Sequence, residues 1–505
     1  FRSSVIITLC LIVSAALGFA AQIVYASIFG ASSDMDSYFR IISIPSSITG
    51  ISAVIFTSVL IPAFAKLKSK PEDLDIFIYS TWIRIIFISL LFVVIGSLLT
   101  TMNINTFLPV NSDNHKLIGV QITLMIWVGS GFVILSSFLT AVLNYNQRFY
   151  EVSVTSFLPS LCMITSVLLL HEEFGVRSIA LGYLTGFLVQ FVYLLRVTKI
   201  AHKFRDILGY RLLNKKYLLK QALLITLSLL PFTSIAPIAY YLVSDLEAGS
   251  VSYIGFSQNF ASFLSVVVSM GISIVSLPDL SHKFAEGKKD SSLVHFEKSL
   301  RVVLLLAMFF AGSIIALRHP IFTFFYQRGE FDADSVMNLS SVVIWYLLGA
   351  VFIGGLNLLR TLFYSKGELG GLAKMGVVTI VIFCLFASIL KHGFSFIGIG
   401  MAYFISFAFL FFMTLYLAKN NGLSLLNKNF TSFLFKSAGL AIVSCVFVSI
   451  SQTLFETIAS PLMIVFGFLQ YFTIYMICAL FIVEINEVNE IKQALVRAVR
   501  NYRKL

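Results

Sequence analysis

The sequence predicts an all-α polytopic membrane protein of about 14 transmembrane helices, arranged as two pseudo-symmetric six-helix bundles followed by two C-terminal helices. Hydrophobic residues make up 58% of the 505-residue chain and charged residues only 12%, whereas soluble domains carry roughly 25% charged residues. The mean hydropathy is +0.92. Uncharged runs of about 20 residues, long enough to cross a hydrocarbon core about 30 Å thick, recur along the whole chain. A soluble fold is therefore excluded.

The apolar runs place the helices in order along the chain. The first run is too long for the apolar region of a signal peptide, so we interpret it as helix 1. The first six predicted spans are 5–30, 37–65, 76–101, 117–143, 152–170 and 178–195. The next eight are 221–243, 250–278, 302–317, 336–359, 375–390, 394–417, 437–453 and 461–483.

The distribution of positive charge predicts the orientation of these spans. With the N-terminus inside, 28 of the 36 Lys and Arg residues lie in cytoplasmic segments and five on the opposite side. This imbalance follows the positive-inside rule, and an even number of spans places both termini in the cytoplasm. The net charge of +12 therefore follows membrane topology, and we expect no nucleic-acid partner.

A weak internal repeat supports two halves of six helices. Helix 2 ends at Pro62 and helix 8 at Pro278, while helix 4 ends at Tyr145 and helix 10 at Tyr364, so the two pairs have nearly the same spacing along the chain. Two like-oriented halves predict a central cavity that opens alternately to either side. The predicted parts are an N-terminal bundle (1–200), a basic cytoplasmic linker (201–220), a C-terminal bundle (221–420), helices 13 and 14 (421–484) and a basic amphipathic cytoplasmic tail (485–505).

The sequence contains none of the motifs that would predict an enzyme. HExxH, GxSxG and Walker motifs are absent, as is a paired carboxylate inside a span. The cysteines are dispersed within predicted spans without CxxC pairing, so we interpret them as small buried apolar residues. They are Cys10, Cys162, Cys384, Cys445 and Cys478. We expect a transporter with no catalytic residues, cofactor or metal.

Several short segments resemble the MurJ (MviN) family of lipid II flippases within the multidrug/oligosaccharidyl-lipid/polysaccharide exporter superfamily. They are Leu17–Phe19, Ile28–Ser32, Asp36–Phe39, the helix-breaking pair Ile44–Pro45, Leu277–Ser281, Phe325–Phe331 and Phe363–Lys366. The resemblance implies two bundles around a cationic cavity, a groove for a polyprenyl tail formed by helices 13 and 14, and alternating access without ATP hydrolysis. It also implies a multi-pass protein of the bacterial cytoplasmic membrane.

The chain departs from this family at the positions of its cavity arginines. The corresponding residues are Ala15, Ala21 and Gln22 in helix 1, Thr49 in helix 2, and Asn259, preceded by Gln258, in helix 8. Asp36 is retained. Because the resemblance implies that those arginines meet the substrate's pyrophosphate, the divergent positions leave the identity of the lipid-linked substrate open.

The candidate substrate-binding residues have two grounds: a charge within or at the end of a span is costly and marks function, and the resemblance places amides where the family has charged groups. They are Asp36, Arg40, Gln22, Gln258, Asn259 and Arg360. Arg40 either binds a diphosphate or glycan or is a surface arginine paired with Asp36. Arg360 either receives a phosphate at the cytoplasmic entrance or anchors its helix at the interface. The amides either bind sugar hydroxyls or join helices without a ligand.

The leading hypothesis is a flippase that moves an undecaprenyl-diphosphate-linked saccharide, lipid II or a related precursor, across the membrane. The alternatives are a polysaccharide or O-antigen repeat-unit flippase and a non-transporting scaffold for envelope synthesis. A drug antiporter is disfavoured because no carboxylate lies in the middle of a span. The expected partners are the lipid-linked substrate, membrane lipids and envelope-synthesis enzymes; a monomer is compatible with the sequence, and the oligomeric state is open. The outer loop 318–335 is either a gate or a plain connection.

Overall fold

The structure is a computed structural model that describes residues 2–67, 71–107, 113–199, 215–275, 289–366, 368–420, 428–454 and 460–479. Most of the predicted linker, through residue 214, lies outside these ranges. So do the motif Leu277–Ser281 and the tail 485–505.

The regular elements in these ranges are helices, as expected where lipid cannot satisfy exposed backbone groups. Eleven of the described helices are long and apolar enough to cross a membrane. Over its described residues each of the fourteen predicted spans falls on helix, with the run 152–170 divided between two helices, and the predicted fold class is confirmed. The first-half elements are α1 (Arg2–Phe29), α2 (Ser33–Ile55), η1 (Phe56–Leu60), α3 (Ile61–Leu67), α4 (Pro71–Met102), α5 (Ile104–Phe107), α6 (Asp113–Tyr145), α7 (Phe149–Thr155), α8 (Leu158–Phe174) and α9 (Arg177–Thr198). The later ones are α10 (Lys215–Leu242), α11 (Ser250–Val275), α13 (Lys289–Ala316), α14 (Arg318–Tyr326), α15 (Ala333–Lys366), α16 (Leu369–Asn420), α17 (Lys428–Leu454) and α18 (Ser460–Ile477).

The predicted helix break at Ile44–Pro45 is wrong, because α2 continues through Pro45. Proline removes one backbone N–H, and serine hydroxyls are among the groups that help a membrane helix tolerate that loss. Around this point Ser43 donates to the carbonyl of Arg40 and Ser47 to that of Ser43. The departure from α-helical geometry comes later, in the π-helical turn η1.

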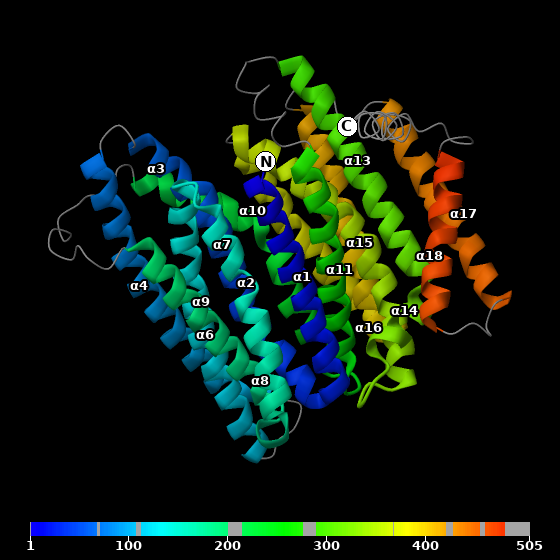
Figure 1. Ribbon diagram of the computed structural model, residues 1–505, viewed down its shortest axis with the longest axis horizontal. Helices are drawn as coiled ribbons and strands as arrows, with labels where there is room; N and C mark the ends of the chain where they lie inside the picture. Colours follow the sequence, from blue (N-terminus) through cyan, green and yellow to red (C-terminus); the bar gives the residue numbers. More distant parts are fainter. Residues whose placement is uncertain are drawn as a thin grey trace. The chain divides into compact units, whose positions relative to one another are not determined.

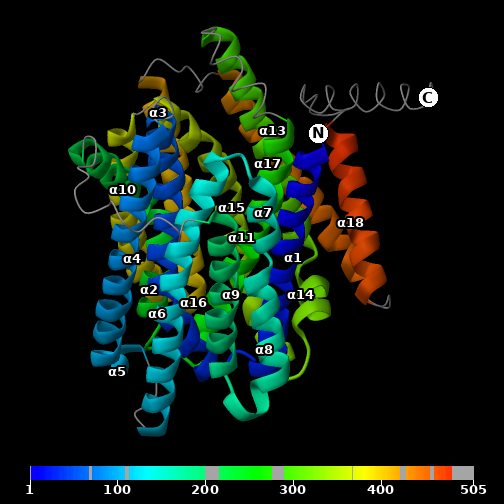
Figure 2. The same ribbon diagram turned by 60° about the vertical axis from the view of Figure 1, so that its left-hand side comes forward.

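The described residues form two compact units. Unit 1 comprises Phe1–Asn259, Arg328–Ser335 and Lys366–Ile399, and unit 2 comprises Phe260–Gln327, Val336–Ser365 and Gly400–Leu505. The boundaries predicted at residues 200, 220 and 420 stay predictions. In unit 1, α9 packs against both α6 and α8 (Figures 1 and 2). Its core includes Trp82, which stacks on Phe138 and Phe191.

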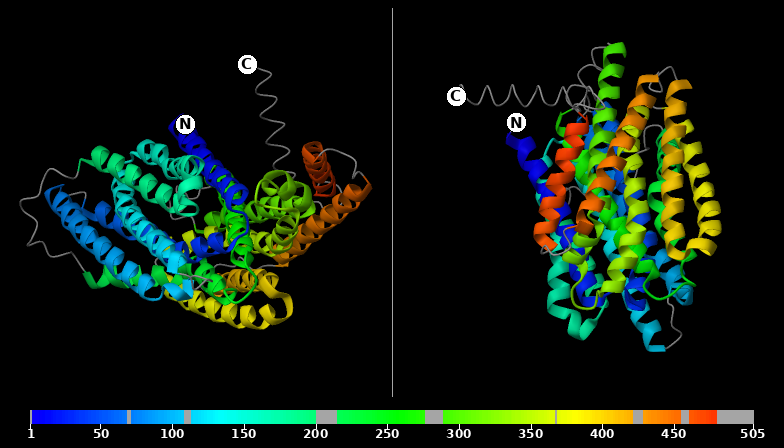
Figure 3. Two further views of the ribbon diagram at one scale, coloured as in Figure 1. Left: turned by 90° about the horizontal axis from the view of Figure 1, so that it is seen from below. Right: turned by 90° about the vertical axis from the view of Figure 1, so that its right-hand side faces the viewer.

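In unit 2, α17 lies against α13 and α18 against α14 (Figure 3). Phe309 of α13 contacts four rings of α18 edge-on. The hydroxyl of Tyr475 donates to the carbonyl of Leu305 at 3.2 Å. These contacts fasten the two C-terminal helices to α13.

The internal repeat is visible in the backbone. Gly175, between α8 and α9, has φ 54° and ψ −140°, and Ser395, at the equivalent place within α16, has φ 52° and ψ −137°. Ser395 is the point at which α16 divides into the two predicted spans. The two hairpins thus turn in the same way at equivalent positions.

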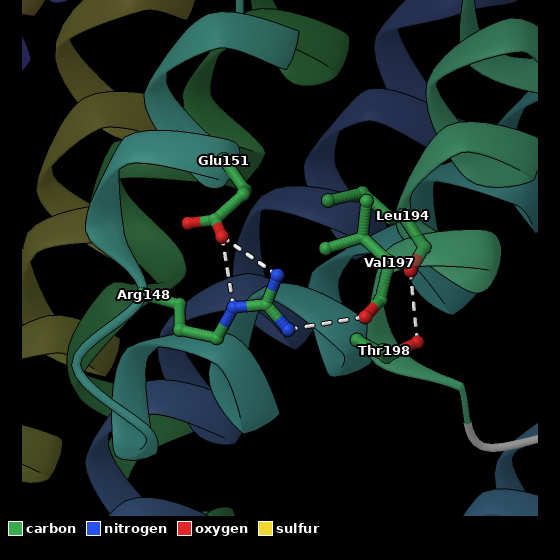
Figure 4. Close-up of polar contacts among 5 residues, drawn as sticks. All are labelled: Arg148, Glu151, Leu194, Val197 and Thr198. Atoms are coloured by element: carbon green, nitrogen blue, oxygen red, sulfur yellow. Dashed lines mark hydrogen bonds and ion pairs between the residues drawn. The ribbon is translucent and has the colours of Figure 1, made fainter.

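Arg148, at the start of α7, ties the α6–α7 turn to the end of α9 (Figure 4). Its guanidinium pairs with Glu151 at 2.6 Å and donates to the carbonyl of Val197 at 3.1 Å. A cation at a helix C-terminus satisfies carbonyls that lack intrahelical partners. This arginine therefore has a structural role in unit 1.

Candidate functional site

Asp36 holds the start of α11. Its carboxylate is 2% exposed and accepts the backbone N–H of Gly249 at 2.8 Å and that of Ser252 at 2.7 Å. The hydroxyl of Ser252 donates a third bond at 2.5 Å. The first N–H groups of a helix lack intrahelical acceptors, so a carboxylate supplied by α2 both caps α11 and complements its positive end. We call this contact the Asp36 clasp.

Close backbone packing surrounds the clasp. Gly249 has φ +92°, and a Cβ there would lie 2.6 Å from the carbonyl oxygen of Ala31. Nearly two turns beyond Gly249, the ring of Phe39 fills the space in front of Gly255, where a Cβ would lie 2.9 Å from ring atoms. Glycine at both positions lets α2 and α11 approach closely enough for the carboxylate to reach its donors.

The two amides at the divergent positions bind each other. Asn259 of α11 donates from Nδ2 to Oε1 of Gln22 on α1 at 3.0 Å. Asn259 lies two turns beyond Ser252, about 10 Å further along the helix at 1.5 Å per residue. Gln258 is partly buried, and its Oε1 has no hydrogen-bond partner among the described residues. The structure thus brings Gln22 and Asn259 together and leaves an acceptor available on Gln258.

Arg40 is buried beside the clasp. It is 6% exposed, and within the described ranges its Nε has no hydrogen-bond partner. Asp36 lies one turn away and interacts with it electrostatically, but its oxygens are occupied by α11. Arg40 is therefore not at the surface, although it still interacts electrostatically with Asp36. A buried guanidinium with a free donor is a ready partner for an anion or a saccharide oxygen.

Arg360 lies in unit 2, near the end of α15. It donates to the side-chain oxygen of Asn357, one turn earlier on the same helix. The side chain of Tyr364 also interacts with it electrostatically. The other five candidates belong to unit 1.

Sequence reasoning missed Gly249 and Ser252 as partners of Asp36. A signal was present, because the spacing between Asp36 and Ser252 along the chain is the same as the spacing between Pro62 and Pro278. The clasp therefore joins equivalent positions of the repeat. No group of His, Cys, Asp or Glu in the described part of the chain could hold a metal ion.

Comparison with known proteins relates the whole arrangement to one family. The family model described as lipid II flippase MurJ matches residues 25–473. A probable lipid II flippase MurJ from Borreliella burgdorferi is 22% identical, over 69% of this chain and 70% of its own. The lipid II flippase MurJ from Thermosipho africanus is 24% identical, over 70% of this chain and 72% of its own.

Solved structures show the same fold. A structure of lipid II flippase MurJ in an inward closed conformation superposes with a TM-score of 0.76 at 21% identity, covering 94% of this chain and 98% of that one. An inward-facing multidrug resistance transporter of the MATE family, within the MOP superfamily, reaches 0.61 at 13% identity, covering 84% and 99%. Because the family model spans most of the chain, this multi-pass membrane protein belongs to the lipid II flippase MurJ family.

Proposed function

We propose that this chain is a flippase that moves lipid II across the bacterial cytoplasmic membrane by alternating access. The observation that carries the proposal is the match to the lipid II flippase MurJ model over residues 25–473. Lipid II carries a saccharide on an undecaprenyl diphosphate, so its polar head needs donors that can replace water inside the bilayer. Buried donors without a protein partner are the groups that meet this need.

The polar side chains of unit 1 supply a binding surface for that head. We assign Arg40 to an oxygen of the diphosphate or glycan, because its buried Nε is unpartnered in the described structure. Gln22, Gln258 and Asn259 supply amide groups for sugar hydroxyls, and the Gln22–Asn259 bond must exchange for bonds to the substrate. Arg360, on a different unit, receives the diphosphate as it arrives from the cytoplasm.

Asp36 acts mainly on access. Its three bonds to α11 close the space between α2 and α11 at that end of the helices. For the cavity to open there, these bonds must break, and water or substrate must take over the carboxylate and the helix N–H groups. The positive-inside pattern supports placing this end outside and both termini in the cytoplasm.

A related lipid-linked saccharide is a second candidate substrate. The neutral Gln22–Asn259 pair favours it, because amides recognise hydroxyls and provide no charge for a diphosphate. Membrane lipids surround the protein in either case, and envelope-synthesis enzymes are the expected source and destination of the cargo.

Complementation in a bacterium depleted of its own lipid II flippase tests the proposal. The chain should restore growth, and it should restore labelling of outer-leaflet lipid II by an amine-reactive reagent that does not cross the membrane. Arg40→Ala should lower this labelling at least tenfold, while Arg148→Ala, which removes an exposed arginine from the α7–α9 contact, serves as the matched control. If cells that lack the chain accumulate a different lipid-linked saccharide, the second candidate becomes the assignment. If depleted cells that lack the chain have the same distribution of lipid II between the leaflets as cells that express it, transport is refuted.

A further inference from the structure

A loop from the second half of the chain docks onto α1 through a backbone hydrogen bond. The loop follows α14 and carries the segment Arg328–Phe331, which belongs to unit 1. The N–H of Glu330 donates to the carbonyl of Ser27, in the last turn of α1, at 3.0 Å. This bond joins segments that are distant in the sequence and uses no side chain.

Two glycines make this contact possible, one on each side. Gly30 has φ +62°, and a Cβ there would lie 2.6 Å from the carbonyl oxygen of Glu330. Gly329 has φ +56°, and a Cβ there would lie 2.1 Å from the carbonyl oxygen of Ser27. Both positions therefore require glycine for two reasons: the backbone angle φ is positive, and a Cβ would clash with the opposite backbone. The relation is reciprocal, since each glycine faces a residue close to the other.

The loop is firmly held on its own side. Phe331 is 1% exposed and packs edge-on against Phe256 of α11 with ring centroids 5.8 Å apart. Asp332 accepts the N–H of Ser335 at 2.8 Å and so caps α15, and this bond lowers the pKa of the Asp332 carboxyl. The loop is thus fixed to α11 and α15, while its attachment to α1 is one backbone bond between two glycine-lined surfaces.

We propose that Gly30 and Gly329 form a backbone latch, separate from the Asp36 clasp, that holds the α14–α15 loop on α1 and must part in each transport cycle. The inference rests on the proposed alternating-access function and assigns these glycines a positioning role in it. The close approach of the two backbones at Gly30 and Gly329 leaves no room for water when the latch is closed. The bond that defines the latch runs between a backbone N–H and a backbone carbonyl, so the bond itself contains no titratable group.

Hydrogen exchange of the full chain in lipid nanodiscs measures the latch directly. Gly30→Ala and Gly329→Ala should each speed exchange of the Glu330 amide at least tenfold. Gly175→Ala is the matched control, because Gly175 also has positive φ, at +54°, but a Cβ there meets nothing within 4 Å. It should leave the Glu330 amide unchanged. Exchange in both latch variants equal to that in Gly175→Ala overturns the proposal.

A reversible cross-link tests whether the latch must part. A Cβ at Gly30 would lie 3.2 Å from the Cβ of Glu330, slightly less than the roughly 3.5–4.5 Å between the Cβ atoms of disulfide-bonded cysteines, so a small local shift brings the two cysteines into range. In a background lacking the five native cysteines, oxidised Gly30→Cys/Glu330→Cys protein should lose lipid II flipping, and reduction should restore it. Full flipping by the fully cross-linked protein refutes the latch, and if the crowding at Gly30 prevents the cross-link, the exchange experiment decides. If even the reduced protein and its cysteine-free parent move no lipid II, the proposed function fails, while the exchange experiment still judges the latch.

Discussion

Removing the Asp36 carboxylate should loosen the start of α11 by an amount that can be worked out from the structure. Asp36→Ala deletes the acceptor of two backbone N–H groups, those of Gly249 and Ser252, and of the Ser252 hydroxyl, in a site where Asp36 is 2% exposed. Each buried donor left unsatisfied costs about 1–3 kcal/mol, and loss of a helix cap costs about 1 kcal/mol. Allowing for partial rescue by water, we expect the local opening free energy to fall by about 3 kcal/mol.

Hydrogen exchange resolved to the first two turns of α11 measures this change. A loss of about 3 kcal/mol lowers protection roughly 100-fold, since each 1.4 kcal/mol is a factor of ten. Asp36→Asn keeps one acceptor oxygen but turns an amide NH₂ toward the donors, so its loss should be intermediate, about tenfold. Asp332→Ala is the control, because Asp332 caps α15 with a single backbone bond at an exposed position.

The control should change protection only at the start of α15. If Asp36→Ala leaves exchange of residues 249–255 within twofold of wild type while the protein stays folded, the carboxylate does not hold α11. If the clasp closes the cavity as proposed, Asp36→Ala should also increase modification of a cysteine placed at Asn259 by a reagent confined to the outside.

Three further predictions concern other contacts. Ser395→Gly should raise the free energy of unfolding by about 1 kcal/mol in a denaturant titration, because serine is strained at φ 52° and glycine is not; a destabilised variant would contradict this. The hydrogen bond from Lys391 lowers the pKa of Asp245, so this pair should stabilise the fold above an ordinary aspartate pKa of about 3.9 and lose that effect as pH falls through the lowered value; Asp245→Asn should remove this component of a thermal-stability profile against pH, and an unchanged profile would count against it. A double-mutant cycle of Gln22→Ala and Asn259→Ala should give a coupling of about 0.6 kcal/mol in unfolding free energy, typical of hydrogen bonds between membrane helices; additive effects would show that the bond contributes nothing.

The helices could be predicted from the sequence because a span needs a long apolar run, and this chain has few charges to interrupt one. The break inside the run 152–170 was missed, since α7 ends at Thr155 and α8 begins at Leu158 with Pro159 in its first turn. Pro45 misled in the opposite direction, because a membrane helix can continue through a proline. A proline in the sequence does not by itself distinguish a broken helix from a continuous one, because the packing of neighbouring helices decides between them.

The candidate site was predicted as a set of residues and not as an arrangement. Charge within a span singled out Arg40, and the family resemblance singled out Gln22 and Asn259; the structure buries the first and pairs the other two. The partners of Asp36 are mostly backbone groups, which carry no side-chain signature, so the spacing of the repeat was the signal that could have pointed to them. Gly30 and Gly329 likewise have meaning only once segments distant in sequence are in contact, so pattern analysis could not assign them.

The repeat extends to a glycine that packs against a tyrosine ring in each half of the chain. Gly129 faces the ring of Tyr183, where a Cβ would lie 2.7 Å from a ring carbon, and Gly349 faces the ring of Tyr403, where the corresponding distance is 2.5 Å. Alanine at either glycine therefore introduces the same kind of clash with a tyrosine ring, and the two variants can be compared in the same protein and the same lipid. A difference in outcome between the two must then come from their surroundings, such as the Ser130 hydroxyl 3.1 Å from that of Tyr183. The internal repeat thus provides a reference site within the same protein, which a non-repeating fold lacks.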